Sequence, residues 1–185
     1  MKLLKFFIPL LFIGFANAAD YNRAEFGGWI DADKDCMNSR IETLISDSVV
    51  PVKIASCKVQ SGMWVDPYTA EVLKDSTKAD IDHIVPLKEA WLSGADKWTK
   101  AKRTQFANDP ENLMAVTIAA NRSKGHSDPA EWMPPNSAYW QTYVKKWTHI
   151  KTKYGLTIDK AEAAAIAHYT SMNTGKAAPT CATGN

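Results

Sequence analysis

Cysteine is scarce in this chain of 185 residues, and its three cysteines include no Cys-x-x-Cys pair. Structural zinc clusters are commonly built from such closely spaced thiolates, so the spacing argues against one. The chain also lacks internal repeats, low-complexity linkers and a second long apolar run. We therefore expect a single domain that is soluble once any leader peptide has been removed.

The first 18 residues, MKLLKFFIPLLFIGFANA, have the pattern of a secretory signal peptide. Lys2 and Lys5 precede an apolar stretch over residues 6–15, and small residues, Ala16 and Ala18, end the segment. A retained membrane anchor is the alternative, but it needs roughly 20 apolar residues and this run is shorter. We predict a mature chain of residues 19–185 that is secreted or periplasmic and has no membrane association.

An exported chain with three cysteines is expected to form one disulfide and to keep one thiol. We predict a Cys36–Cys57 bridge, with Cys181 left over near the C-terminus. Spacing alone leaves the other pairings open.

The chain has a formal net charge of +2, which falls to zero without Lys2 and Lys5, and the remaining charge is unevenly distributed. Residues 20–82 contain 12 acidic and 7 basic side chains, whereas residues 83–185 contain 8 acidic and 13 basic ones. A basic half is compatible with a polyanionic partner, although charged faces are more commonly just solvated.

The middle of the chain predicts a strand, a helical insertion, a second strand and a helix. A β-branched apolar run over residues 81–85 ends at Pro86, and residues 112–116 form a similar run. Residues 88–106 between them have helical spacing, with Arg103 largely outside the apolar face. Thr117 can cap a short helix that runs towards Gly125.

The flanking segments complete an α+β fold class. We expect a helix capped near Asn38, a strand over residues 49–59 and a short strand over residues 63–65. Two C-terminal helices are predicted, one from Ser137 to Gly155 and one opening at Asp159. The aromatic residues of the first C-terminal helix could stack on bases, but their helical spacing favours a place in the core.

The strand, strand, helix order is expected to bring an acid, a histidine and an amide to one point. Asp82 and His83 end the first strand, Asn112 begins the second, and Asn121 lies on the following helix. Asp82 and Asn121 can offer hard oxygen ligands to one divalent cation, with water completing the shell. Asp80 lies on the same strand face as Asp82 and could replace it.

His83 would stay off the metal and act as a general base. A histidine that titrates near neutral pH suits this task, and phosphodiester hydrolysis needs such a base together with a cation that neutralises developing charge. The alternative is a histidine hydrogen-bonded in the core.

The sequence resembles the HNH endonucleases of the ββα-metal superfamily. DHIVP (82–86), ENL (111–113) and NRSKG (121–125) look like the corresponding pieces of the HNH domain in the RNA-guided CRISPR effector. WVDPYT (64–69), DIDHIVPLKEAW (80–91) and NRSKGHSDPAEWMPP (121–135) are similar to a group of small secreted bacterial HNH nucleases.

This resemblance implies a ββα-metal core over about residues 79–135, with His83 as general base and Asp82 and Asn121 as metal ligands. Asn112 would order the loop behind His83. Asn121 stands where the family usually has a histidine, and amide oxygen favours Mg²⁺ or Mn²⁺ over Zn²⁺ at a single site.

A second helical ligand would be expected at Gly125, which leaves the coordination number open. We expect Arg122, Lys124 and His126 to contact substrate phosphate. The protein is then predicted to be a secreted, metal-dependent endonuclease that cleaves DNA with little sequence specificity. RNA cleavage and the oligomeric state are left open by the sequence.

Two other function classes are compatible with the sequence. One is a periplasmic zinc hydrolase with His83 and His126 as ligands, and the other is a binding module for nucleic acid or cell surfaces that uses the same scaffold without catalysis.

An acidic loop suggests a separate Ca²⁺ site. Asp31, Asp33, Asp35 and Glu42 occupy positions 1, 3, 5 and 12 of a calcium-loop pattern, but Cys36 stands where that pattern has glycine.

Overall fold

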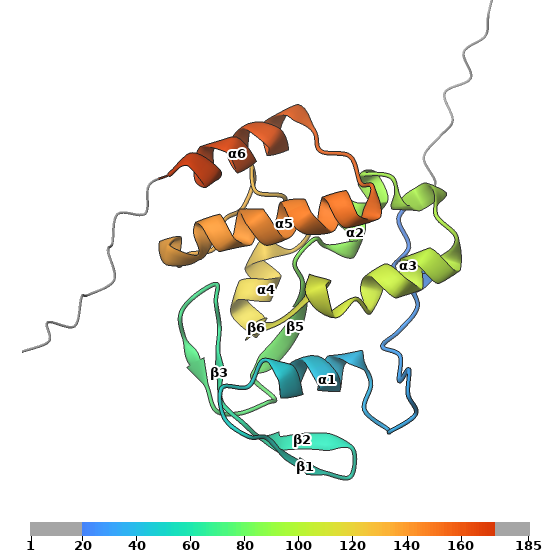
Figure 1. The fold of residues 1–185 in the computed structure, drawn as a ribbon, viewed down its shortest axis with the longest axis vertical. Coiled ribbons are helices and arrows are strands. Elements are labelled where there is room, and N and C mark those ends of the chain that lie inside the picture. The colour runs from blue at the N-terminus through green and yellow to red at the C-terminus, as the bar shows by residue number, and fades with distance from the viewer. Residues whose placement is uncertain (1–19, 173–185) are drawn as a thin grey trace, which may run out of the picture.

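The central element of the fold is an antiparallel pair of strands that leads directly into a helix (Figure 1). The computed structural model describes residues 20–172, so the predicted signal peptide and Cys181 lie outside it. Strand β5 (Ala79–His83) pairs with β6 (Leu113–Thr117), and α4 (Ile118–Lys124) follows. Thr117 accepts a hydrogen bond from the Ala120 amide and caps α4, as predicted.

The two faces of the β5–β6 pair are buried by different clusters. Ile81 and Ala115 pair across the strands and pack with Trp64 in one hydrophobic cluster. Met114 and Val116 belong to the second cluster, which contains most of the buried helical residues. Because side chains alternate along a strand, Asp80 and Asp82 point to the same face as Met114 and Val116. Two acidic side chains therefore lie on a face of the strand pair that they share with apolar side chains.

The insertion between the strands is divided rather than continuous. It consists of α2 (Leu87–Leu92), the 3-10 helix η2 (Ala95–Lys97), α3 (Lys100–Ala107) and η3 (Pro110–Asn112). Gly94 divides it, since its φ of 126° lies outside the helical range.

Arg103 is buried, at 8% exposed, contrary to the prediction that it lies outside the apolar face. Its guanidinium donates to the Trp98 carbonyl at 2.6 Å and pairs with Glu25 at 2.9 Å. These partners compensate the charge and hold the N-terminal segment against α3.

The N-terminal part differs from the predicted strand over residues 49–59. Two short strands, β1 (Lys53–Ala55) and β2 (Lys58–Ser61), form a hairpin instead. Ser56 and Cys57 have φ values of 50° and 58°, so both turn residues are left-handed, as in a tight hairpin turn. Serine and cysteine are not the usual residues for this conformation, and the turn has no sequence signal.

The N-terminal region is cross-linked by the predicted disulfide. Cys36 and Cys57 are bridged, with a Cα–Cα distance of 5.7 Å. Helix α1 (Ser39–Ser46) begins just after Cys36 and is capped by Asn38, as predicted. A second hairpin, of β3 (Trp64–Val65) and β4 (Val72–Leu73), follows β2.

Two helices close the described chain and cover the core. The short η4 (Ser137–Tyr139) leads into α5 (Trp140–Tyr154), which ends at a left-handed Gly155. Helix α6 (Lys160–Ser171) opens with the predicted capping box of Asp159 and Glu162. Tyr143, Trp147 and Tyr154 of α5 belong to the core, as predicted, whereas Trp140 is half-buried.

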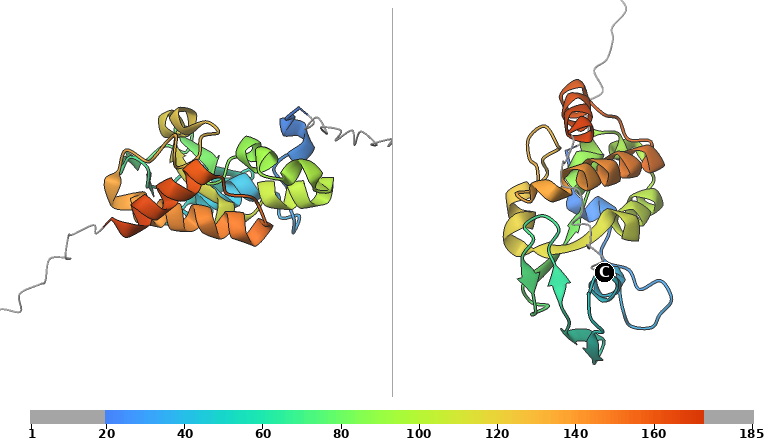
Figure 2. Two further views of the ribbon diagram at one scale, coloured as in Figure 1. Left: turned by 90° about the horizontal axis from the view of Figure 1, so that it is seen from above. Right: turned by 60° about the vertical axis from the view of Figure 1, so that its left-hand side comes forward.

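The C-terminal helices α5 and α6 lie at the end of the molecule opposite the β1–β2 hairpin, and α1 lies beside that hairpin (Figure 1). In Figures 1 and 2 the β1–β2 hairpin lies at the end away from α6, and β5, β6 and α4 lie between them. The described residues thus form the mixed α+β domain that the sequence predicts. Their helices include none with the length and apolarity needed to cross a membrane.

Candidate functional site

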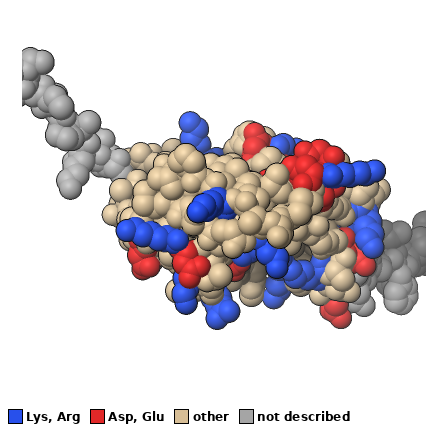
Figure 3. All heavy atoms as spheres, turned by 90° about the horizontal axis from the view of Figure 1, so that it is seen from below, with Lys and Arg blue, Asp and Glu red and all other residues tan. Residues whose placement is uncertain are grey.

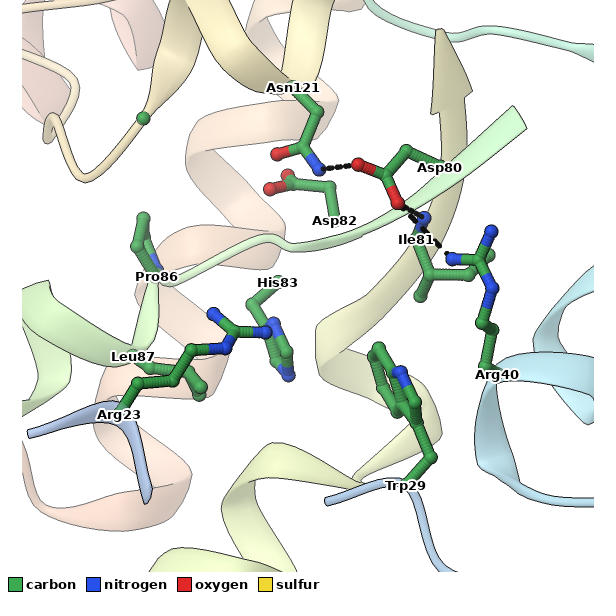
Figure 4. A pocket seen from close by; sticks show the side chains of 11 residues that line it. Arg23, Trp29, Arg40, Asp80, Ile81, Asp82, His83, Pro86, Leu87 and Asn121 are labelled. Atoms are coloured by element: carbon green, nitrogen blue, oxygen red, sulfur yellow. Dashed lines mark hydrogen bonds and ion pairs between the residues drawn. The ribbon is translucent and has the colours of Figure 1, made fainter. Parts of the chain in front are cut away.

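A pocket of about 410 Å³ lies beside the end of β5 (Figure 4). It is lined by residues from the N-terminal segment, α1, β5, α2 and α4: Arg23, Trp29, Arg40, Asp80, Ile81, Asp82, His83, Pro86, Leu87, Asn121 and Gly125. The structure therefore brings the three polar residues of the predicted constellation, Asp82, His83 and Asn121, to one cavity.

His83 is held in one tautomer by a backbone carbonyl. Its Nε2 lies 2.8 Å from the Ala107 oxygen, which can only accept, so Nε2 carries the proton and Nδ1 keeps a lone pair. The imidazole is 7% exposed and stacks on Trp29, with ring centroids 5.5 Å apart and planes at 2°.

Burial lowers the pKa of His83 to about 4. This value departs from the expectation of a histidine that titrates near neutrality. At pH 7 the ring is neutral and Nδ1 carries a lone pair, but the lowered pKa makes it a weaker base than an ordinary histidine.

Asp82 is a buried carboxylate with a buried ammonium beside it. Lys124 Nζ lies 2.9 Å from both carboxylate oxygens and donates to the His83 carbonyl at 2.8 Å. Tyr68 donates its hydroxyl to Asp82 Oδ2 at 2.7 Å. Burial raises the pKa of Asp82 and lowers the pKa of Lys124, and the attraction between the two groups opposes both shifts.

Asn121 is oriented by Asp80. The Asn121 amide nitrogen donates to Asp80 Oδ2 at 2.8 Å, and Arg40 pairs with Asp80 Oδ1 at 3.2 Å. With its nitrogen committed to Asp80, the Asn121 amide turns its oxygen towards the Asp82 carboxylate (Figure 4).

The donor set fits a hard divalent cation that keeps much of its water. A carboxylate has about four lone-pair positions, and Lys124 and Tyr68 take three of those on Asp82, which leaves one on Oδ1. The Asn121 oxygen supplies a second ligand. Two protein oxygens with water completing the shell suit Mg²⁺, while the nearby Lys124 charge weakens the attraction for any cation.

Asn112 lies outside the pocket and supports it from behind. It is fully buried, accepts from the Val85 amide at 2.9 Å and donates to the Val85 carbonyl at 3.3 Å. Its own carbonyl accepts from the Ile84 amide at 2.8 Å. These bonds tie down the two residues after His83, which is the arrangement that the resemblance implies.

The three predicted phosphate contacts do not line the pocket. Arg122 and His126 are exposed, and His126 accepts a hydrogen bond from Lys88 at 3.2 Å. Lys124 is 1% exposed and surrounded by its partners, so a direct contact with solvent phosphate does not fit its position. Lys124 lies three residues after Asn121 on α4, so helix periodicity puts the two residues on neighbouring positions of the helix surface. Periodicity does not show which residues pack against that surface, so it could not predict that Lys124 is buried.

Sequence reasoning missed four residues at this site. Tyr68 lies in the WVDPYT motif, but its bond to Asp82 has no local sequence signal. Arg23, Trp29 and Arg40 precede β5 by about 40 residues or more and reach the pocket only through tertiary packing.

Surface charge does not single out a substrate-binding region on the side shown in Figure 3. Lys and Arg side chains are dispersed there, with Asp and Glu among them.

The acidic loop brings three of its four residues together. Ligand atoms of Asp31, Asp33 and Asp35 lie within 4.8 Å of one another, and all three residues are exposed. Asp31 already accepts from two amides of its own loop, and Cys36 has the positive φ, 73°, of the position where glycine is usual. Calcium binding at these residues and Glu42 stays a prediction.

Comparison of the sequence with known proteins finds a match to a nuclease family. The family model for the C-terminal domain of GmrSD restriction endonucleases matches residues 53–169, which is more than half of the chain. A protein of Arthroderma benhamiae named "Uncharacterized secreted protein" is 40% identical over 148 residues, covering 79% of this chain and 72% of the relative.

That relative is fungal, so the likeness to a bacterial group stays a prediction. No solved structure matches the chain. The family match covers β5, β6 and α4, the elements that carry Asp82, His83 and Asn121. The chain therefore belongs to the family of GmrSD restriction endonuclease C-terminal domains, which are HNH-like nuclease domains.

Proposed function

We propose that this protein is a metal-dependent endonuclease with a ββα-metal core that hydrolyses phosphodiester bonds of DNA with little sequence specificity. The observation that carries the proposal is the pocket itself, in which His83, with Nε2 held by the Ala107 carbonyl and Nδ1 left unprotonated, lies with Asp82 and Asn121. A base and a pair of hard ligands are the components that this hydrolysis needs.

Each residue of the pocket has a separate role in this reaction. His83 Nδ1 accepts a proton from water while the water oxygen attacks phosphorus and the bond from phosphorus to O3′ breaks. The Ala107 carbonyl keeps the ring in the required tautomer, because Nε2 stays the donor. Asp82 and Asn121 would hold Mg²⁺ or Mn²⁺, which when bound neutralises charge on the phosphate and on the leaving oxygen.

Little sequence specificity is expected because the pocket has no element that reads base edges. Its lining residues offer charges and hydrogen-bond donors to the sugar-phosphate backbone, and such contacts carry no sequence information. RNA has the same backbone chemistry and is a second possible substrate.

The predicted secreted or periplasmic location is confirmed. The chain contains a disulfide, which persists in oxidising compartments, and its fungal relative is named a secreted protein.

The zinc hydrolase alternative lacks a site in the described part of the chain. His83 and His126 line different pockets. Among residues 20–172, the group of three or more His, Cys, Asp or Glu residues close enough to share one metal is Asp31, Asp33 and Asp35, and it contains neither histidine.

Incubation of plasmid DNA with the purified protein and Mg²⁺ tests the proposal. The wild type should cut the plasmid, EDTA should stop it, and His83→Ala should lower kcat by about 10²- to 10⁴-fold. His149→Ala is the matched control, because His149 is exposed on α5, outside the pocket. Circular dichroism verifies folding of each variant. Cleavage that persists in His83→Ala would exclude the mechanism, and binding without cleavage by the wild type would favour the non-catalytic module.

A further inference from the structure

The N-terminal strap, defined here as residues 20–38, reaches the pocket although it lies outside the segment that the family model matches. It contains the 3-10 helix η1 (Arg23–Phe26) and contributes Arg23 and Trp29 to the lining of the cavity. Figure 4 shows both side chains on the side of His83 opposite the β5 acids, with the Arg23 guanidinium beside the imidazole. The strap thus forms a wall of the pocket.

The strap is anchored at several points along its length. Phe26 is fully buried against Trp91 and Phe106, and the Ile30 amide donates to Asn108 at 2.9 Å. At the far end, Cys36 is bridged to the β1–β2 hairpin. Such anchoring gives a loop a defined position relative to His83, and the loop therefore does not have to be ordered by substrate.

The acids of the pocket pair with cations other than Arg23. The lining contains two acids, and each already has a cation: Arg40 pairs with Asp80, and Lys124 pairs with Asp82. Arg23 is exposed and hydrogen-bonds to the Tyr21 side chain, and within residues 20–172 no carboxylate lies at ion-pair distance from it. An exposed guanidinium beside the base faces the space where a phosphate must lie, and its planar donors match phosphate oxygens in pairs.

We infer that the strap is a working part of the active site and that Arg23 binds a phosphate of the nucleic-acid backbone next to the scissile bond. The inference rests on the proposed function for its substrate class. In this inference Arg23, and not the buried Lys124, is the cation that contacts substrate. The strap, which the family match does not include, thereby has a role in substrate binding.

Equilibrium binding tests the inference separately from cleavage. Short duplex DNA carrying a fluorophore is titrated with His83→Ala protein in Mg²⁺ at several NaCl concentrations from about 50 to 200 mM. Adding Arg23→Gln should weaken binding about ten- to a hundredfold and lower the slope of log K against log salt by about 1. Arg23→Lys should recover part of the affinity, since it restores the charge without the paired donors. A matching RNA duplex shows which nucleic acid is preferred.

Lys100→Gln is the matched control, because Lys100 is exposed on α3, does not line the pocket and loses the same charge. Equal affinities and salt slopes for Arg23→Gln and Lys100→Gln, or no binding of either duplex before substitution, would overturn the inference. If the wild type fails to cleave but the Arg23 effect is present, the proposed catalysis fails while the binding role stands.

Discussion

The buried pair of Lys124 and Asp82 permits a quantitative prediction about stability. Lys124→Met should lower the free energy of unfolding by about 3–5 kcal/mol, because it leaves a buried carboxylate without its charge partner. The residues are 1% and 3% exposed, and Lys124 also donates to the His83 carbonyl, so water cannot replace the lost contacts without opening the core. For a chain of this size, the melting temperature should fall by about 6–20 °C.

Urea denaturation followed by circular dichroism measures this change, with Arg122→Met as control. Arg122 lies on the same helix but is exposed, so its loss should change stability by no more than about 0.5 kcal/mol. Asp82→Asn completes a double-mutant cycle. In the double variant no buried charge is left unpaired, and its destabilisation should be smaller than the sum of the two single effects by at least about 1 kcal/mol. Additive effects, or a Lys124→Met protein as stable as the wild type, would refute this account of the site.

Three further predictions concern the disulfide, the metal ligand and pH. Replacing Cys36 and Cys57 with serine should cost about 3 kcal/mol of stability, since they lie 21 residues apart, and urea denaturation that shows no loss would contradict this. Asp80→Ala should weaken Mg²⁺ binding about ten- to a hundredfold in calorimetry, because Asn121 loses its orienting partner; an unchanged affinity would exclude that role. In EDTA, wild-type stability should fall more steeply than that of His83→Gln as pH drops from 6.5 to 4. In this pH window the histidine of the unfolded chain takes up a proton, whereas the buried histidine, with a pKa of about 4, does not, so the unfolded state is favoured. Parallel stability curves for the wild type and His83→Gln would contradict this effect of burial.

Local sequence signals were sufficient for most elements that carry the site. The apolar run before Pro86 and the caps at Thr117 and Asp159 predicted the positions of β5, α4 and α6 because backbone geometry there depends on neighbouring residues. The Cys36–Cys57 bridge was predicted correctly as well. The tight turn at Ser56 was missed because its residues favour no left-handed conformation.

The sequence by itself determined the order of β5, β6 and α4 and the residue types that could meet at the end of β5. The environment of those residues was decided by the tertiary structure alone. Burial lowers the pKa of His83. Lys124 is buried in an ion pair with Asp82, and a hydrogen bond to Asp80 orients Asn121. Arg23 reaches the same cavity from a distant part of the chain. Desolvation and long-range packing depend on the whole fold, and no local pattern of residues contains that information.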